Sequence, residues 1–244
     1  VAFASASIGQ VHHAVLKDGK VVVVKVQHDG IEERVRNDLE ILIQLADLAE
    51  HYSKEISRYR PLATAREFAK TLRDELDFTR EQNNLARFAH NFAGDAMITI
   101  PVSHPDCCSR RILTMDRLDG IELSKGEALQ TSGFDLTDIA KRGANMFLQM
   151  VFRDGFYHAD PHPGNLMVLE HAAIGLLDCG MVGRVDEDLR EQIEDLLLAA
   201  IDRDSKRLLE SVVELGEIPP DFDRALLQDE LVNFIDDFGG QSID

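Results

Sequence analysis

The chain has 244 residues, of which 44% are hydrophobic, and a formal net charge of −18. This is enough apolar material for one large domain or two small lobes with a buried core. The negative charge excludes non-specific nucleic-acid binding, which needs a basic surface to displace counterions. Three cysteines without a Cys-x-x-Cys pair argue against a zinc site and favour reduced thiols and a cytoplasmic location. No apolar run reaches the roughly 20 residues that a membrane-spanning helix needs.

The first half of the chain shows strand signals followed by helical ones. Two β-branched runs, at residues 11–15 and 21–26, flank a turn at Asp18-Gly19 and predict a β-hairpin. Apolar residues then recur at helical spacing over 31–50 and 64–92, which predicts two helices. Their expected inner faces are Val35, Leu39, Leu42, Ile43 and Ala46 in the first, and Phe68, Leu72, Leu76, Leu85 and Phe88 in the second.

The second half becomes mainly helical after two further strand signals. Strands are expected at 98–102 and 111–115, then a helix from Leu136 to Gly155, an irregular loop at 158–165, a short hairpin at 166–177 and a helix from Asp186. This order predicts an α+β fold with two lobes. A small β-rich N-lobe with a helical insertion takes residues 1–118, and a mainly helical C-lobe takes residues 119–244.

Three polar residues in the second half have the spacing that phosphoryl transfer requires. Asp160 precedes Asn165 by five residues in the irregular loop, and Asp178 begins an Asp-x-Gly turn after the hairpin. In kinases one carboxylate positions the acceptor, while an amide and a second carboxylate hold Mg²⁺. Each residue alone is a common cap or turn residue, but the combination is specific and predicts this site. A second triplet, Asp237-Phe238-Gly239, lies in an acidic helical stretch without a preceding hairpin, so it is not assigned this role.

The front half offers a lysine and a small-residue loop for the same chemistry. Lys25 lies in an apolar strand, where its charge must be paired, bind phosphate or reach water from a strand edge. A kinase-like site also needs a helix glutamate, for which Glu75, Asp77 and Glu81 are candidates that composition cannot separate. The loop before the hairpin stands where kinases carry a glycine-rich phosphate loop. It keeps only Gly9, and its small residues still let backbone N–H groups approach phosphate.

Together these motifs resemble the UbiB (AarF, ADCK) family of atypical kinases. The matching stretches are Ala4–His12, Val24–Gln27, Glu75–Glu81, His158–Asn165 and Asp178–Gly180, which span most of the chain. The resemblance implies a protein-kinase-like fold and a site for ATP or ADP with Mg²⁺. The nucleotide is expected to contact Ala4, Ser5, Ala6, Ser7, Ile8, Gly9, Val11, Lys25 and Met115.

The resemblance also implies a role for each motif residue. Lys25 is expected to bind phosphate, with Glu81 as its ion-pair partner and Asp160 as the catalytic-loop aspartate. Asn165 and Asp178 are expected to be metal ligands. Glu75 and Asp77 match a regulatory Glu-x-Asp motif, which in relatives meets a Lys-x-Gly-Gln element over the site. That element is absent here, and the chain starts without methionine, so we expect a segment of a longer protein.

The implied function is a kinase or ATPase that supports isoprenoid-quinone (ubiquinone) biosynthesis. A lipid or quinone-precursor ligand, quinone-biosynthesis proteins and the inner membrane surface are the expected partners. Protein phosphorylation is less expected, because no Ala-Pro-Glu segment follows Gly180. Two alternatives stay open: a small-molecule kinase of the choline or aminoglycoside kinase type, and a nucleotide-binding scaffold without catalysis.

Overall fold

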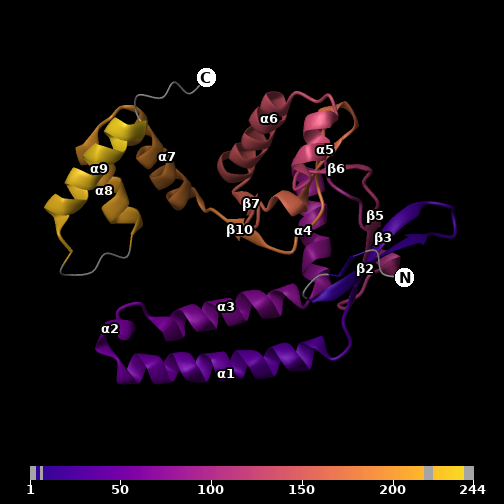
Figure 1. Cartoon of the computed structure of the whole chain (residues 1–244), viewed down its shortest axis with the longest axis horizontal. Helices are drawn as coiled ribbons and strands as arrows, with labels where there is room; N and C mark the ends of the chain where they lie inside the picture. Colours follow the sequence, from indigo (N-terminus) through magenta and orange to yellow (C-terminus); the bar gives the residue numbers. More distant parts are fainter. Residues whose placement is uncertain (1–3, 6–7, 217–221, 239–244) are drawn as a thin grey trace. The chain divides into compact units, whose positions relative to one another are not determined.

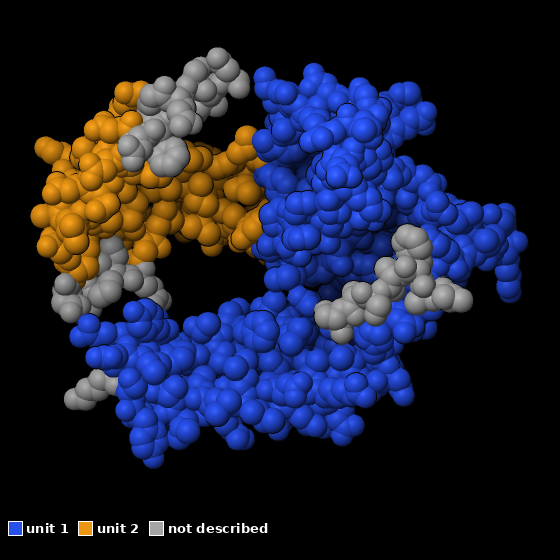
Figure 2. Space-filling model, in the orientation of Figure 1, with its two compact units in different colours: residues 1–147, 158–183 blue, residues 148–157, 184–244 orange. Residues whose placement is uncertain are grey.

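The computed structural model describes residues 4–5, 8–216 and 222–238 and contains two compact units (Figure 1). One unit comprises residues 1–147 and 158–183, and the other comprises 148–157 and 184–244 (Figure 2). All the predicted site residues fall within the ranges of the first unit. The boundaries between these units do not coincide with the lobe boundary expected at 118/119. The division into two lobes at that position stays a prediction.

An antiparallel sheet of four strands carries the lysine. Its order is β1-β2-β3-β5, with β1 at Ala4–Ser5, β2 at Gly9–Val15, β3 at Val21–Gln27 and β5 at Ile112–Asp116. The predicted hairpin is confirmed: β2 pairs with β3, and Gly19 in the turn has the positive φ of 90° that glycine accommodates. Lys25 pairs with Val11 on one side and Leu113 on the other, so its strand is internal rather than an edge.

A helical insertion separates the lysine strand from the next helix of the site. It contains α1 (Ile31–Tyr52), α2 (Lys54–Ser57) and α3 (Pro61–Glu75), with α4 (Phe78–Asn91) following. In Figure 1, α1 and α3 lie side by side, and they contact each other along their lengths. The prediction of one helix over 64–92 was wrong, because the helix is interrupted at residues 76–77. Asp77 there is extended and caps α4, its side chain accepting a hydrogen bond from the Thr79 N–H at 3.0 Å.

The expected inner faces of these helices are only partly correct. Leu39, Leu85 and Phe88 are buried as predicted. Leu42 and Phe68, however, are 38% and 53% exposed. Helical periodicity marks an apolar stripe, but it does not show which of its residues find a packing partner.

A second small sheet adjoins the segments that carry Asp160, Asn165 and Asp178. Its order is β4-β9-β8-β6, with β4 at Ile98–Thr99, β6 at Gly120–Glu122, β8 at Leu166–Leu169 and β9 at Ile174–Leu176. The predicted hairpin is β8 and β9, which pair antiparallel, and Asp178 lies two residues after the end of β9. Beside this sheet, Leu129 and Ile139 pack in one apolar cluster with Val168.

The remaining elements of the described residues are short strands, turns and helices. They are α5 (Gly126–Thr131), α6 (Leu136–Leu148), β7 (Phe156–His158), β10 (Val182–Arg184), the 3₁₀ turns η1 (Pro105–Cys107), η3 (Pro163–Asn165) and η4 (Glu170–Ala172), and the π-helical turn η2 (Gln149–Arg153). The second unit contains α7 (Glu187–Ile201), α8 (Ser205–Leu215) and α9 (Arg224–Phe238). Asp186 caps α7 at the predicted start of that helix. Asp237 and Phe238 end α9, while Gly239 lies outside the described residues.

Candidate functional site

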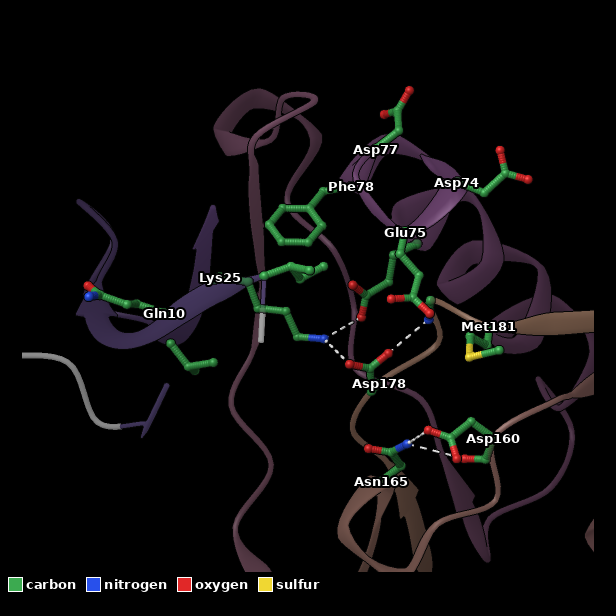
Figure 3. Close-up of a pocket in the computed structure, with 15 residues that line it drawn as sticks. Gln10, Lys25, Asp74, Glu75, Asp77, Phe78, Asp160, Asn165, Asp178 and Met181 are labelled. Atoms are coloured by element: carbon green, nitrogen blue, oxygen red, sulfur yellow. Dashed lines mark hydrogen bonds and ion pairs between the residues drawn. The ribbon is translucent and has the colours of Figure 1, made fainter. Parts of the chain in front are cut away.

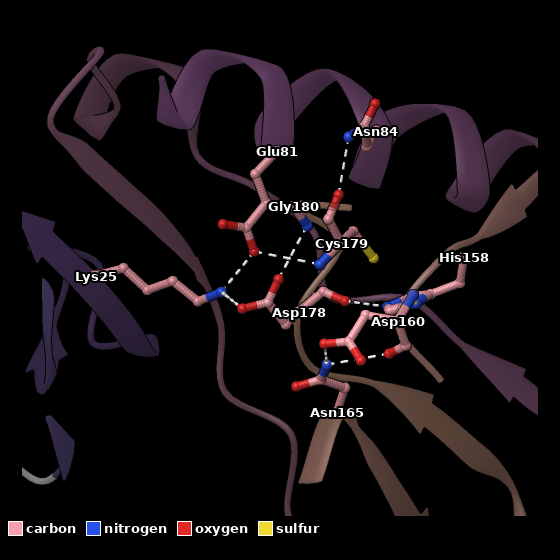
Figure 4. Close-up of polar contacts among 9 residues, drawn as sticks. All are labelled: Lys25, Glu81, Asn84, His158, Asp160, Asn165, Asp178, Cys179 and Gly180. Carbon is pink, nitrogen blue, oxygen red and sulfur yellow. Dashed lines mark hydrogen bonds and ion pairs between the residues drawn. The ribbon is translucent and has the colours of Figure 1, made fainter. Parts of the chain in front are cut away.

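Lys25 forms ion pairs with two carboxylates from distant parts of the chain. Its Nζ lies 2.5 Å from Glu81 Oε1 and 3.0 Å from Asp178 Oδ2 (Figure 3, Figure 4). Strand β3 supplies the lysine, α4 supplies Glu81, and the turn after β9 supplies Asp178. The lysine and Glu81 side chains are only 13% and 5% exposed. Of the three acidic candidates from the sequence, Glu81 is therefore the one that the structure brings to the lysine.

The three charges alter one another's protonation. Burial alone would lower the pKa of Lys25, but the charges of Glu81 and Asp178 outweigh burial and hold that pKa above its ordinary value. Burial would raise the pKa of Asp178, but Lys25 and a hydrogen bond from the Gly180 N–H hold it below the ordinary value. For Glu81 burial prevails, and its pKa is raised despite the lysine. Lys25 is thus a fixed cation at neutral pH.

The loop at residues 158–165 orients its own polar groups. Asn165 Nδ2 donates to Asp160 Oδ2 at 2.8 Å and to the Asp160 carbonyl at 3.1 Å. These bonds leave the Asn165 Oδ1 directed away from Asp160 (Figure 4). The Asp160 N–H donates to Nδ1 of the buried His158 at 3.1 Å, so His158 carries its proton on Nε2. That Nε2 donates to the Asp178 carbonyl, which ties the two loops together.

One cavity of about 250 Å³ collects these groups (Figure 3). It is lined by Ile8, Gly9, Gln10, Val11, Lys25, Asp74, Glu75, Asp77, Phe78, Glu81, Asp160, Asn165, Asp178, Gly180 and Met181. Four lining residues had no predicted role at the site: Gln10, Asp74, Phe78 and Met181. Gln10 and Phe78 lie within the matching stretches, and Asp74 and Met181 directly adjoin them.

Some predicted nucleotide contacts line this cavity and others do not. Ile8, Gly9 and Val11 line it, whereas Ala4 and Ser5 form β1 and pair with β2. Met115 is buried in β5 and is not one of the lining residues. Ala6 and Ser7 lie outside the described residues.

The two acidic residues of the Glu-x-Asp motif occupy different positions. Glu75 ends α3 and faces the cavity, and its pKa is raised by burial and by the charges of Asp178, Asp160 and Glu81 (Figure 3). Asp77 instead uses Oδ1 to cap α4. Both residues of the motif line the cavity, and Asp77 also fixes the start of the helix that carries Glu81.

The available oxygen atoms fit magnesium that arrives with a nucleotide. Within the described ranges, no three His, Cys, Asp or Glu residues are close enough to hold a metal by themselves. Mg²⁺ does not need such a group, because it keeps waters and is held by one or two carboxylates together with phosphates. Asp178 and the Oδ1 of Asn165 are hard oxygen donors at the same cavity.

In the part of the chain that the structure describes, no helix combines the length and apolarity needed to span a bilayer.

Comparisons with known proteins identify the family of this chain. Residues 1–212 match the model of the ABC1 atypical kinase-like domain. The chain is 38% identical over 223 residues to the "Probable protein kinase UbiB" of Sodalis glossinidius (strain morsitans), covering 89% of this chain and 41% of the relative. It is 39% identical over 224 residues to the protein of the same name from Klebsiella pneumoniae (strain 342), with the same coverage. The chain thus spans 41% of the length of these curated relatives.

A solved structure shows the same fold. The complex of Rv3197 with erythromycin from Mycobacterium tuberculosis aligns with a TM-score of 0.71 at 22% identity, covering 98% of this chain and 60% of the other. The predicted α+β kinase-like fold is confirmed, as is the resemblance to UbiB proteins. The chain belongs to the family of ABC1 atypical kinase-like domains.

Proposed function

We propose that this chain is the nucleotide-binding core of a UbiB-type atypical kinase or ATPase that uses magnesium and supports isoprenoid-quinone biosynthesis. The observation that carries the proposal is Lys25 held between Glu81 and Asp178, at a cavity that Asp160 and Asn165 also line. Five groups from four separate segments converge there. Each is of the type that phosphoryl transfer uses.

Lys25 is the group proposed to bind nucleotide phosphate. Its raised pKa keeps it charged, and Glu81 holds its Nζ toward the cavity. The ammonium therefore does not need to be reoriented when an anion enters. The backbone from Ile8 to Val11 lines the same cavity, and we assign the phosphate-covering role to this segment.

Asp160 is the group proposed to orient the acceptor. Asn165 fixes one of its carboxylate oxygens, and the other can accept a proton from a hydroxyl group or water. In the transfer, the acceptor oxygen forms a bond to the terminal phosphorus while the bond to the bridging oxygen breaks. The nucleoside diphosphate leaves, and the acceptor proton passes to Asp160. When Mg²⁺ is bound, Asn165 Oδ1 and Asp178 would hold it, and it would neutralise phosphate charge.

The wider role rests on the family. The printed name of the matched relatives is "Probable protein kinase UbiB". We assign to this chain a lipid or quinone-precursor ligand and a location peripheral to the inner membrane, on the cytoplasmic side. Partner proteins of quinone biosynthesis belong to the same proposal.

The proposal is tested by magnesium-dependent binding and turnover of ATP and ADP. Wild type is compared with Lys25→Ala, Asp178→Asn and a control, Lys17→Ala, at an exposed position in the turn before the same strand. We expect magnesium-dependent binding and hydrolysis by wild type and the control, stimulated by a phenol or quinone-like lipid. Asp178→Asn should lose turnover, and Lys25→Ala should weaken nucleotide binding.

Other outcomes point elsewhere. Phosphorylation of a small alcohol without stimulation by lipid would favour the small-molecule kinase. Binding by wild type without any turnover would favour the scaffold. No binding of nucleotide by wild type, with or without magnesium, would refute the site assignment.

A further inference from the structure

A side chain outside the recognised motifs holds the peptide that follows Asp178. Asn84 Nδ2 donates to the Cys179 carbonyl at 2.8 Å (Figure 4). Glu81, three residues earlier on the same face of α4, accepts from the Cys179 N–H at 3.3 Å. One face of α4 therefore binds both backbone polar groups of Cys179.

Burial makes this contact consequential. Cys179 has no exposed surface, so water cannot replace a partner that its carbonyl loses. A buried carbonyl without a hydrogen bond is costly, and the chain responds to its loss by moving. The peptide of Cys179 is thus held in one orientation as long as Asn84 donates to it.

That orientation determines where the Asp178 carboxylate lies. Cys179 stands between Asp178 and Gly180 in the chain, and the Gly180 N–H donates to Asp178 Oδ1 at 2.9 Å. The other carboxylate oxygen accepts from Lys25 at 3.0 Å. Rotation of the Cys179 peptide would displace the Gly180 N–H and turn the carboxylate out of this arrangement.

We propose that Asn84 is a positioning residue for the metal-binding carboxylate of Asp178, acting through the Cys179 peptide. Asn84 is not one of the residues that line the cavity, so it does not contact the nucleotide. The inference rests on the proposed function, because it takes Asp178 to be a metal ligand. Through Glu81 and Asn84, α4 orients both Lys25 and the segment 178–180, which carries Asp178.

The first test measures the magnesium requirement. Asn84→Leu removes the donor, Asn84→Asp removes it while keeping the size of the side chain, and Asn83→Leu makes the same exchange at the adjacent exposed position. The magnesium concentration for half-maximal nucleotide binding should rise about 10-fold in both Asn84 variants, as for other residues that orient metal ligands. Nucleotide binding in EDTA should be unchanged, and Asn83→Leu should match wild type.

The second test needs no nucleotide. In a Cys107→Ser/Cys108→Ser background, Cys179 is the remaining thiol, and its burial shields it from reagents in solution. Its alkylation by iodoacetamide at pH 8 should be slow in this background and about 10-fold faster when Asn84→Leu or Asn84→Asp is added, because the loop is released. Adding Asn83→Leu should leave the rate unchanged.

The outcomes separate this inference from the proposed function. Faster alkylation with a higher magnesium requirement in the Asn84 variants alone supports the inference. An unchanged alkylation rate, or faster alkylation with an unchanged magnesium requirement, overturns it. If wild type binds no magnesium-nucleotide, the proposed function fails, while the alkylation rate still decides whether Asn84 holds the loop.

Discussion

Replacing Lys25 with methionine would leave a buried carboxylate without its cation. Glu81 is only 5% exposed, so water cannot take over the role of the lysine. Breaking a buried pair from one side costs about 3–5 kcal/mol, because the remaining charge is uncompensated. The Cys179 N–H still donates to Glu81 in the variant, so we expect the lower end, about 3 kcal/mol at pH 8.

The size of this loss should depend on pH. Burial already raises the pKa of Glu81, and the variant lacks the lysine charge that opposes this effect. The folded variant then holds a proton that the unfolded chain releases above about pH 4.3. Between about pH 4.3 and the folded pKa, stability therefore increases as pH falls, by up to about 1.4 kcal/mol per pH unit. The loss relative to wild type should be largest at pH 8 and smaller at pH 6.

Urea unfolding followed by circular dichroism at both pH values measures this, since the chain has no tryptophan for fluorescence. Adding Glu81→Gln to Lys25→Met removes the stranded charge and keeps an acceptor for the Cys179 N–H. The double variant should recover about 2 kcal/mol of the free energy of unfolding that Lys25→Met loses. Lys17→Met, at an exposed position, should have little effect. An equal loss at pH 6 and pH 8, without recovery by Glu81→Gln, would refute the reasoning.

Three further predictions concern the surroundings of this ion pair. Gln27→Leu removes the amide that donates to the Leu76 carbonyl at 2.6 Å, and it should cost about 1–3 kcal/mol in urea unfolding. Gly9→Ala places a new Cβ 2.7 Å from the Val26 carbonyl oxygen, so it should separate two strands of the site and weaken nucleotide binding in calorimetry. The lowered pKa of Asp178 contributes stability that is present above about pH 3.9 and is lost as pH falls through the folded value. Removal of the lysine should raise this pKa in a ¹³C NMR titration.

Matched variants control the first two of these. Gln44→Leu makes the glutamine exchange on the exposed side of α1, and Gly94→Ala adds a Cβ that meets nothing within 4 Å. A loss below about 0.5 kcal/mol for Gln27→Leu would contradict the hydrogen-bond argument, since that is typical of surface changes. If Gly9→Ala and Gly94→Ala bound nucleotide with equal affinity, the argument from the steric clash at position 9 would be contradicted. If the pKa of Asp178 in the wild-type protein were at its ordinary value, the third prediction would be contradicted.

Much of the candidate site could be predicted from spacing along the chain. Asp160 and Asn165 lie in one loop, and the hairpin that follows ends two residues before Asp178, so local geometry brings them together. Lys25 could be predicted once the downstream loop indicated a kinase-like site, because such a site needs a strand lysine. Its apolar strand alone was equally compatible with a side chain that reaches water. These inferences depend on spacing within short segments and on the groups that phosphoryl transfer requires.

Other features depend on contacts between distant segments. Glu81 could not be chosen from composition, because a break in the helix separates it from Glu75. Residues outside the two helices stabilise this break. Gln27 in the lysine strand donates to the Leu76 carbonyl at that break. The apolar spacing continues through the break, so periodicity alone predicts one helix. Asn84 was missed for a similar reason, since its partner is a backbone carbonyl 95 residues away.

The balance of charge around the cavity supports joint binding of metal and nucleotide. Glu75, Asp160 and Asp178 line it together with the Lys25–Glu81 pair, so carboxylates outnumber the single lysine. The pKa of Glu75 is raised by burial and then by the other carboxylates, which shows that they already repel one another. A nucleotide alone would add negative charge to a negative cavity. A divalent cation held by Asp178 would offset that repulsion, so we expect magnesium to contribute to nucleotide affinity as well as to transfer.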